Sequence, residues 1–166
     1  MYAIGSKVVH PCYGAGTIVR IQEKSISDES RRYYVIHTVA REMQIMVPVN
    51  RANSLGLRDV GDAHRLRHTL ALCLETTSQE NVPADLRARQ ADMREQLKSG
   101  HFDQVADVVR ILFLMNNRRP LGTIDRQLLD QGKELLASEL ALASGMDVAE
   151  AMEEIESNLN KMLAQE

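Results

Sequence analysis

The hydrophobic pattern of this sequence changes its period once, near residue 60, and that change limits the folds that the chain can adopt. Before it, segments rich in Val, Ile, Thr and Tyr alternate with a period of about two, which is typical of strands that bury one face. After it, apolar residues recur every three to four positions, which is typical of amphipathic helices. The strand-like segments are GTIVRI (16–21), YYVIHTV (33–39) and QIMVPV (44–49).

The two periods predict an α+β fold with two parts. We expect residues 1–60 to form a small antiparallel β-barrel, because short strands alternate there with turn residues. We expect residues 61–166 to form an all-α bundle of about five helices, delimited by capping residues and helix breakers. These are Asp62 and Thr123 as caps, Pro83 in a first turn, Gly100 and Gly145 as helix ends, and Asp147 with Glu150 as a capping box.

The stretch VVHPCYGAGTIVRI (8–21) places two glycines beside a strand, as nucleotide-binding loops do. A dinucleotide loop needs a third glycine three residues after the second, where this chain has Val19. It also needs a helix to follow, so that the helix N-terminus receives the phosphate. Here another strand follows, and the stretch therefore predicts a hairpin turn.

Other chemistry-bearing patterns are also weak. His64 and His68 are spaced to share a helix face, but zinc needs further ligands, and Cys12 and Cys73 form no CxxC pair. No nucleophile motif is present in the sequence. We therefore expect no enzymatic activity, no metal and no cofactor. No apolar run approaches the roughly 20 residues of a membrane span, so we expect a soluble, cytoplasmic protein that does not bind a membrane.

Charge is distributed unevenly along the chain. The net charge is −3, but residues 134–166 carry one basic and eight acidic side chains, which leaves a mildly positive remainder. Aromatic residues make up 4% of the chain and Trp is absent, so platforms for stacking single-stranded bases are few. Any contact with nucleic acid is expected from the middle helices rather than from the last one.

Several longer segments resemble the CarD/CdnL family of bacterial transcription regulators. They occur in the family's order and together span nearly the whole chain. The N-terminal half alone is also similar to the RNA-polymerase-interacting domain of the transcription–repair coupling factor. The matching segments are IGSKVVHPCYGAGTIVRIQEKSI (4–26), EMQIMVPV (42–49) with NSLGLRDV (53–60), and SGHFDQVADVVRIL (99–112) with LLASELALA (135–143).

The resemblance implies a function in transcription initiation. A Tudor-like N-terminal barrel would dock on the β subunit of RNA polymerase, and the helical part would contact promoter DNA weakly and without sequence preference. Together these contacts would stabilise the open promoter complex. The protein is expected to act as a monomer and without catalysis. The alternative is a polymerase-docking module whose helical part has lost DNA binding and recruits another protein.

The resemblance also implies residues for the docking surface. Family members often carry basic residues at two places there, and Lys24 matches the first, whereas Met46 stands at the second. Met46 is equally compatible with an ordinary barrel position. The implied polymerase-binding residues are Lys24, Ser25, Gln44, Met46, Val47 and Pro48.

For DNA, the resemblance implies Leu86, Arg87, Arg89 and Arg126. Leu86 stands where many family members carry a Trp that wedges between bases, and leucine can wedge a base step, with less area. The arginines could contact phosphates. Leu86 also shares a helical stripe with buried-type residues further along the helix, so a core position is the competing interpretation.

Overall fold

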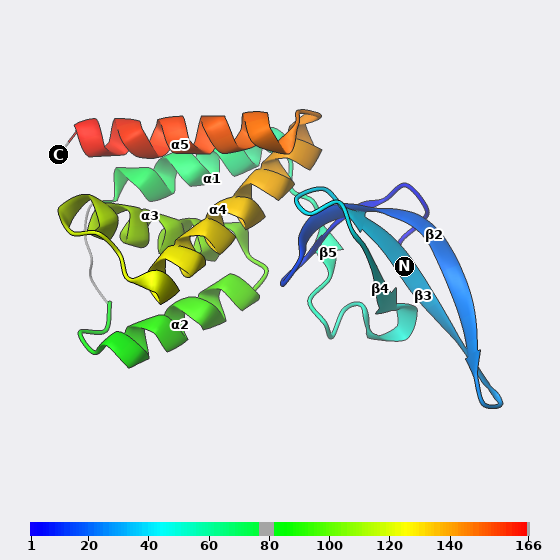
Figure 1. The fold of residues 1–166 in the computed structure, drawn as a ribbon. Helices are drawn as coiled ribbons and strands as arrows, with labels where there is room; N and C mark the ends of the chain where they lie inside the picture. The colour runs from blue at the N-terminus through cyan, green and yellow to red at the C-terminus, as the bar shows by residue number, and fades with distance from the viewer. Residues whose placement is uncertain (77–81, 166) are drawn as a thin grey trace.

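The computed structural model describes residues 1–76 and 82–165 and confirms the predicted α+β fold. A five-stranded antiparallel sheet, bent into a small Tudor-like barrel, is followed by five helices (Figure 1). The strands and the single 3-10 turn are β1 (Lys7–His10), β2 (Gly14–Ile26), β3 (Glu29–Thr38), β4 (Gln44–Pro48), η1 (Val49–Arg51) and β5 (Arg58–Asp59). The helices are α1 (Ala63–Glu75), α2 (Leu86–Lys98), α3 (Phe102–Arg118), α4 (Thr123–Ser144) and α5 (Val148–Ala164).

The strands follow the order β4-β3-β2-β1-β5, so β4 and the short β5 form the two margins of the sheet. Alternation along the strands buries one face, as the period of two predicts. The register between β2 and β3 shifts between Ile18 and Arg20, a bulge that places Val19 at the surface. The barrel core consists of Val8, Ile18, Tyr34, Ile36, Val47, Ala52 and Leu57.

The glycine-rich stretch is a hairpin, but its turn lies slightly earlier than the glycines. Residues 11–13 make the turn between β1 and β2, and Gly14 follows with a φ of 81°, which suits glycine. Gly16 lies within β2, where a Cβ atom would come within 2.6 Å of the His37 carbonyl oxygen. The first glycine therefore serves the turn, and the second allows two strands to approach closely.

The helical part is built around α3, whose apolar residues are buried on nearly every side. The sequence VADVVRILFLM (105–115) within this helix is mostly apolar, which suits a helix in the centre of the domain. Among the described residues, no helix is both long enough and apolar enough to cross a membrane.

The helix boundaries agree with most of the sequence signals and correct three of them. Asp62 caps α1 by accepting a hydrogen bond from the Arg65 amide, and Gly145 ends α4 in the left-handed conformation. Pro83, however, precedes α2, which begins at Leu86 after the cap Asp85. The N-caps of α4 and α5 make no side-chain hydrogen bond. Gly122 rather than Thr123 is the cap of α4, and Asp147 caps α5 without the expected capping-box bond.

Candidate functional site: an open sheet edge and an apolar groove

β4 is a margin of the sheet and pairs with β3 alone among the described strands. Along β4 the side chains alternate, with Gln44 and Met46 exposed and Val47 only 2% exposed. The exposed position of Met46 is compatible with a docking residue. Val47 belongs to the barrel core, so its side chain is not available to a partner and only its backbone could take part.

The backbone of β4 offers unpaired groups at its outer side. The Thr38 amide donates to the Met43 carbonyl at 2.9 Å, and antiparallel ladders alternate between pairs that exchange hydrogen bonds and pairs that do not. By this alternation, the amides of Gln44 and Met46 point away from β3. The backbone of Pro48 also points away from β3, so its lack of an amide proton removes no hydrogen bond between β3 and β4.

Lys24 and Ser25 lie on the β2–β3 hairpin rather than beside β4. They are exposed and pair with Arg31 and Ser30, beyond the point where β4 ends opposite Tyr33. The hairpin projects past the rest of the barrel (Figure 1). A partner strand along β4 could reach this hairpin only by extending past the end of β4.

An apolar groove lies in the helical part, where the start of α2 meets the start of α4. Leu86 is 55% exposed at its rim and Ile124 is 43% exposed, and both line the groove together with Pro120 and Leu121. The interpretation of Leu86 as core is therefore wrong for this chain. The buried stripe of α2 instead consists of Arg89, Met93 and Leu97.

Arg89 has a structural role that the sequence analysis did not predict. Its guanidinium donates two hydrogen bonds to the Asp125 carboxylate, at 3.0 and 2.9 Å, and Gln90 donates a third at 3.2 Å. The hydrogen bonds from Arg89 lower the pKa of Asp125 more than burial raises it. Because Arg89 is 7% exposed and occupied by Asp125, it is not the phosphate contact that we expected. It holds α2 against α4 next to the groove.

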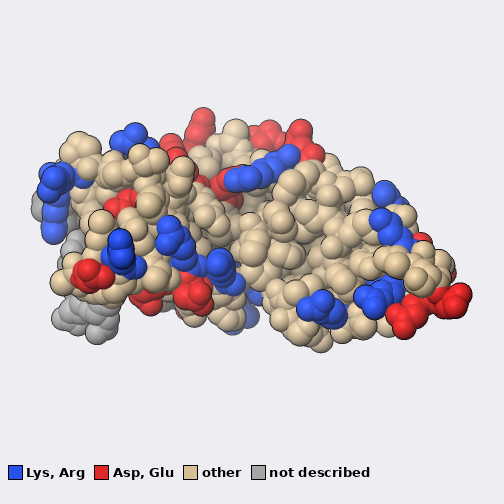
Figure 2. Space-filling model, turned by 60° about the horizontal axis from the view of Figure 1, so that its bottom comes forward, with Lys and Arg blue, Asp and Glu red and all other residues tan. Residues whose placement is uncertain are grey.

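One exposed arginine lines the groove, and two more follow groove residues in the chain. Arg87 follows Leu86, Arg119 lines the groove, and Arg126 donates to the Leu121 carbonyl at 3.4 Å. Figure 2, which brings the side of α2 forward, shows Lys and Arg side chains spread over the helical half. Sequence reasoning missed Ile124 and Arg119. The Arg-Arg-Pro sequence before α4 was a signal for Arg119, whereas Ile124 resembled any other apolar helix residue.

Within residues 1–76 and 82–165, no group of three or more His, Cys, Asp or Glu side chains is placed to hold a metal ion. His64 and His68 are exposed on one face of α1. At Cys73, burial raises the pKa of the thiol and so disfavours the reactive thiolate. The absence of catalysis remains a prediction.

Two family models match the chain in the order of its two structural parts. The model described as "CarD-like/TRCF RID domain" matches residues 2–61, and the model described as "CarD, C-terminal domain" matches residues 71–156. The chain belongs to the CarD family. A relative, the Bacillus subtilis (strain 168) protein YdeB, whose name describes it as a candidate transcription factor, is 32% identical over 146 residues. That alignment covers 88% of this chain and 94% of YdeB.

Membership in the CarD family confirms the resemblance seen in the sequence, and it assigns the two surfaces to different domains. The open edge of β4 lies in the domain shared with the transcription–repair coupling factor. The groove at Leu86 and Ile124 lies in the C-terminal CarD domain.

Proposed function

We propose that this CarD family protein binds the β subunit of RNA polymerase through its barrel and stabilises the open promoter complex through its helical domain. It acts as a monomer and without catalysis. The match to a domain type named for both CarD and the transcription–repair coupling factor supports polymerase docking. The name of YdeB supports a role in transcription.

The open edge of β4 carries the docking half of this proposal. A strand of the β subunit can extend the sheet by hydrogen bonding to the outward amides of Gln44 and Met46. The exposed Met46 side chain then supplies apolar contact where other family members have a basic residue. Lys24 and Ser25 on the hairpin contribute at the end of the added strand.

The groove carries the DNA half. An apolar side chain that enters a base step unstacks it at a cost of a few kcal/mol, which is offset because the kinked duplex touches more of the protein surface. Leu86 and the neighbouring Arg87 and Arg126 combine an exposed wedge with groups for phosphates. Because few basic side chains contact phosphates, the affinity for free DNA is weak. Docking on polymerase raises the local DNA concentration to about the millimolar range.

Leu86→Ala should shorten the lifetime of the open promoter complex by roughly tenfold, because burying a leucine side chain contributes about 1.5–3 kcal/mol. The lifetime is measured with purified polymerase and promoter after a competitor challenge. Leu72→Ala is the matched control, since Leu72 is 52% exposed but lies on α1 and does not line the groove. Equal lifetimes for the wild-type protein and Leu86→Ala would contradict the wedge.

Arg87→Gln and Arg126→Gln should each reduce the salt dependence of DNA binding, because every lost phosphate contact lowers the slope of log K against log salt by about one unit. The measurement is a salt titration of binding to a short duplex. Arg51→Gln, in the barrel, serves as the control and should leave the slope unchanged. A slope unaffected by both groove variants would exclude these phosphate contacts.

A second function is supported by the exposed apolar groove itself, which could hold a segment of another protein instead of DNA. In that case the barrel still docks on polymerase, and the helical domain recruits the partner. Leu86→Ala would then leave the lifetime of the open complex unchanged in a mixture of polymerase and promoter alone. The variant would instead lose its contact with the recruited protein, and that contact would be insensitive to salt.

A further inference from the structure

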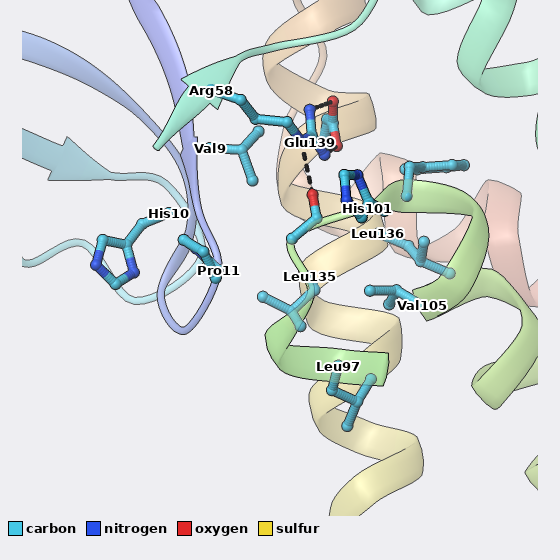
Figure 3. A pocket seen from close by; sticks show the side chains of 12 residues that line it. Val9, His10, Pro11, Arg58, Leu97, His101, Val105, Leu135, Leu136 and Glu139 are labelled. Atoms are coloured by element: carbon cyan, nitrogen blue, oxygen red, sulfur yellow. Dashed lines mark hydrogen bonds and ion pairs between the residues drawn. The ribbon is translucent and has the colours of Figure 1, made fainter. Parts of the chain in front are cut away.

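The ion pair of Arg58 and Glu139 joins the barrel to the helical domain. Arg58 of β5 and Glu139 of α4 meet through two hydrogen bonds of 2.8 and 2.6 Å (Figure 3). The Glu139 side chain is 2% exposed, and apolar residues line the space around the pair. A buried carboxylate with both oxygens engaged by a planar guanidinium is held in one geometry.

The same two side chains also bind the backbone of two further segments. Arg58 donates through Nε to the Gly100 carbonyl, at 2.6 Å, in the turn between α2 and α3. Glu139 accepts from the Gly61 amide, at 2.8 Å, just before α1. The pair therefore fixes the sheet margin, the linker, α4 and the α2–α3 turn at a single point, which we call the joint.

A neighbouring contact restricts rotation about the joint. Ser138 accepts a hydrogen bond from the Ala15 amide of β2 at 3.0 Å. A Cβ atom at Gly14 would lie 2.6 Å from the Ser138 Oγ atom, so the hairpin and α4 are in close contact. With two attachment points on adjacent residues of α4, the helix has little freedom to swing relative to the sheet.

α4 links the joint directly to the groove. Ile124 and Glu139 lie on the same helix, 15 residues apart in sequence, which corresponds to roughly 22 Å along the axis. A swing of about 10° at the joint would displace the groove by roughly 4 Å over that length. This displacement is comparable to the rise of about 3.4 Å between successive bases, so it would carry Leu86 off its base step.

We infer that Glu139 is a positioning residue that sets the placement of the groove relative to the docking edge. The inference rests on the proposed function, in which the protein contacts polymerase and DNA at the same time. Open-complex stabilisation then depends on a rigid connection between the domains. A flexible tether of the same length would raise the local concentration of the groove near DNA without fixing which base step it meets.

The test compares Glu139→Gln with Glu134→Gln. Glu134 also forms a pair between the domains, with Arg41 at 3.1 Å, but Arg41 is 65% exposed and the pair is therefore weakly constraining. Arg58→Lys is a second variant that retains the charge and loses the bidentate geometry. Spin labels at Ser30→Cys and Asn117→Cys, in a background with Cys12→Ser and Cys73→Ala, report the distance between the domains. Thermal unfolding curves show the temperature range in which each variant is folded.

Glu139→Gln and Arg58→Lys should broaden the distance distribution and shorten the open-complex lifetime about tenfold. Polymerase capture and the affinity for free DNA should stay within about twofold of wild type, and Glu134→Gln should match wild type throughout. An unchanged distance distribution in both joint variants would overturn the inference, whatever the function of the protein. A broadened distribution with an unchanged lifetime, in an assay where Leu86→Ala shortens that lifetime, would overturn the inference and leave the proposed function intact.

Discussion

Met46→Pro should weaken the capture of RNA polymerase by roughly tenfold. Proline removes an outward amide, whose hydrogen bond to an added strand contributes about 1 kcal/mol, and its ring obstructs the approach of that strand. The change should not disturb the barrel, because the Met46 amide is outside the β3–β4 ladder and proline is tolerated on the solvent side of an edge strand. The measurement is a titration of polymerase with labelled protein, combined with thermal unfolding of the variant.

Met46→Leu is the matched control, since it retains the amide and an apolar side chain of similar size. We expect it to bind within about twofold of wild type, because a swap between Leu and Met conserves volume. If Met46→Pro binds polymerase as wild type does while its barrel remains folded, β4 is not the docking edge. If Met46→Leu weakens binding as much as Met46→Pro, the side chain and not the backbone carries the contact.

Asp125→Ala should lower the free energy of unfolding by about 3 kcal/mol, since removing one partner of a buried ion pair leaves the other charge uncompensated. The remaining charge is the Arg89 guanidinium, which is 7% exposed. For a chain of this length such a loss lowers Tm by roughly 6–12 °C. Asp130→Ala is the control on the same helix. Because the Asp130 carboxylate is exposed, this change should alter the free energy of unfolding by less than about 0.5 kcal/mol. A variant as stable as wild type would show that the pair does not hold α2 in place.

The stabilisation from Asp125 should depend on pH in a defined direction. Hydrogen bonds from Arg89 keep the pKa of Asp125 below its ordinary value of 3.8. The contribution is therefore complete above that value and is lost as the pH falls through the lower pKa of the folded state. Unfolding curves of wild type and Asp125→Ala should differ at neutral pH and approach each other in acid. A difference that grows on acidification would contradict this linkage.

The sequence predicted the fold class well because both parts follow strong periodic patterns. The period of two predicted the strands of the barrel. The glycine after a helical run predicted the end of α4, where Gly145 adopts the left-handed conformation. Local signals were less reliable for exact helix starts. The chain between Pro83 and Leu86 does not begin the helix, because the Asp85 side chain provides a better cap for the Ala88 amide.

The site could be predicted only in part, because its decisive contacts join residues far apart in sequence. An arginine on a mostly polar helix predicts an exposed side chain, and the partner that buries Arg89 lies 36 residues away. The pair of Arg58 and Glu139 spans 81 residues, so no local pattern reveals it. Leu86 illustrates the opposite error. Its seven-residue spacing from Met93 suggested that both residues share a buried stripe. Leu86 lies in the first turn of α2, however, and its side chain is exposed, whereas Met93 is buried.

Hydrogen exchange of the protein, alone and bound to RNA polymerase, tests the open edge most directly. Unpaired outward amides should exchange quickly in the free protein and slowly once a strand of the polymerase bonds to them. We predict that peptides containing Gln44 and Met46 gain protection on binding, while α5 exchanges at the same rate in both states. Protection of the helices with no change along β4 would contradict docking by strand addition.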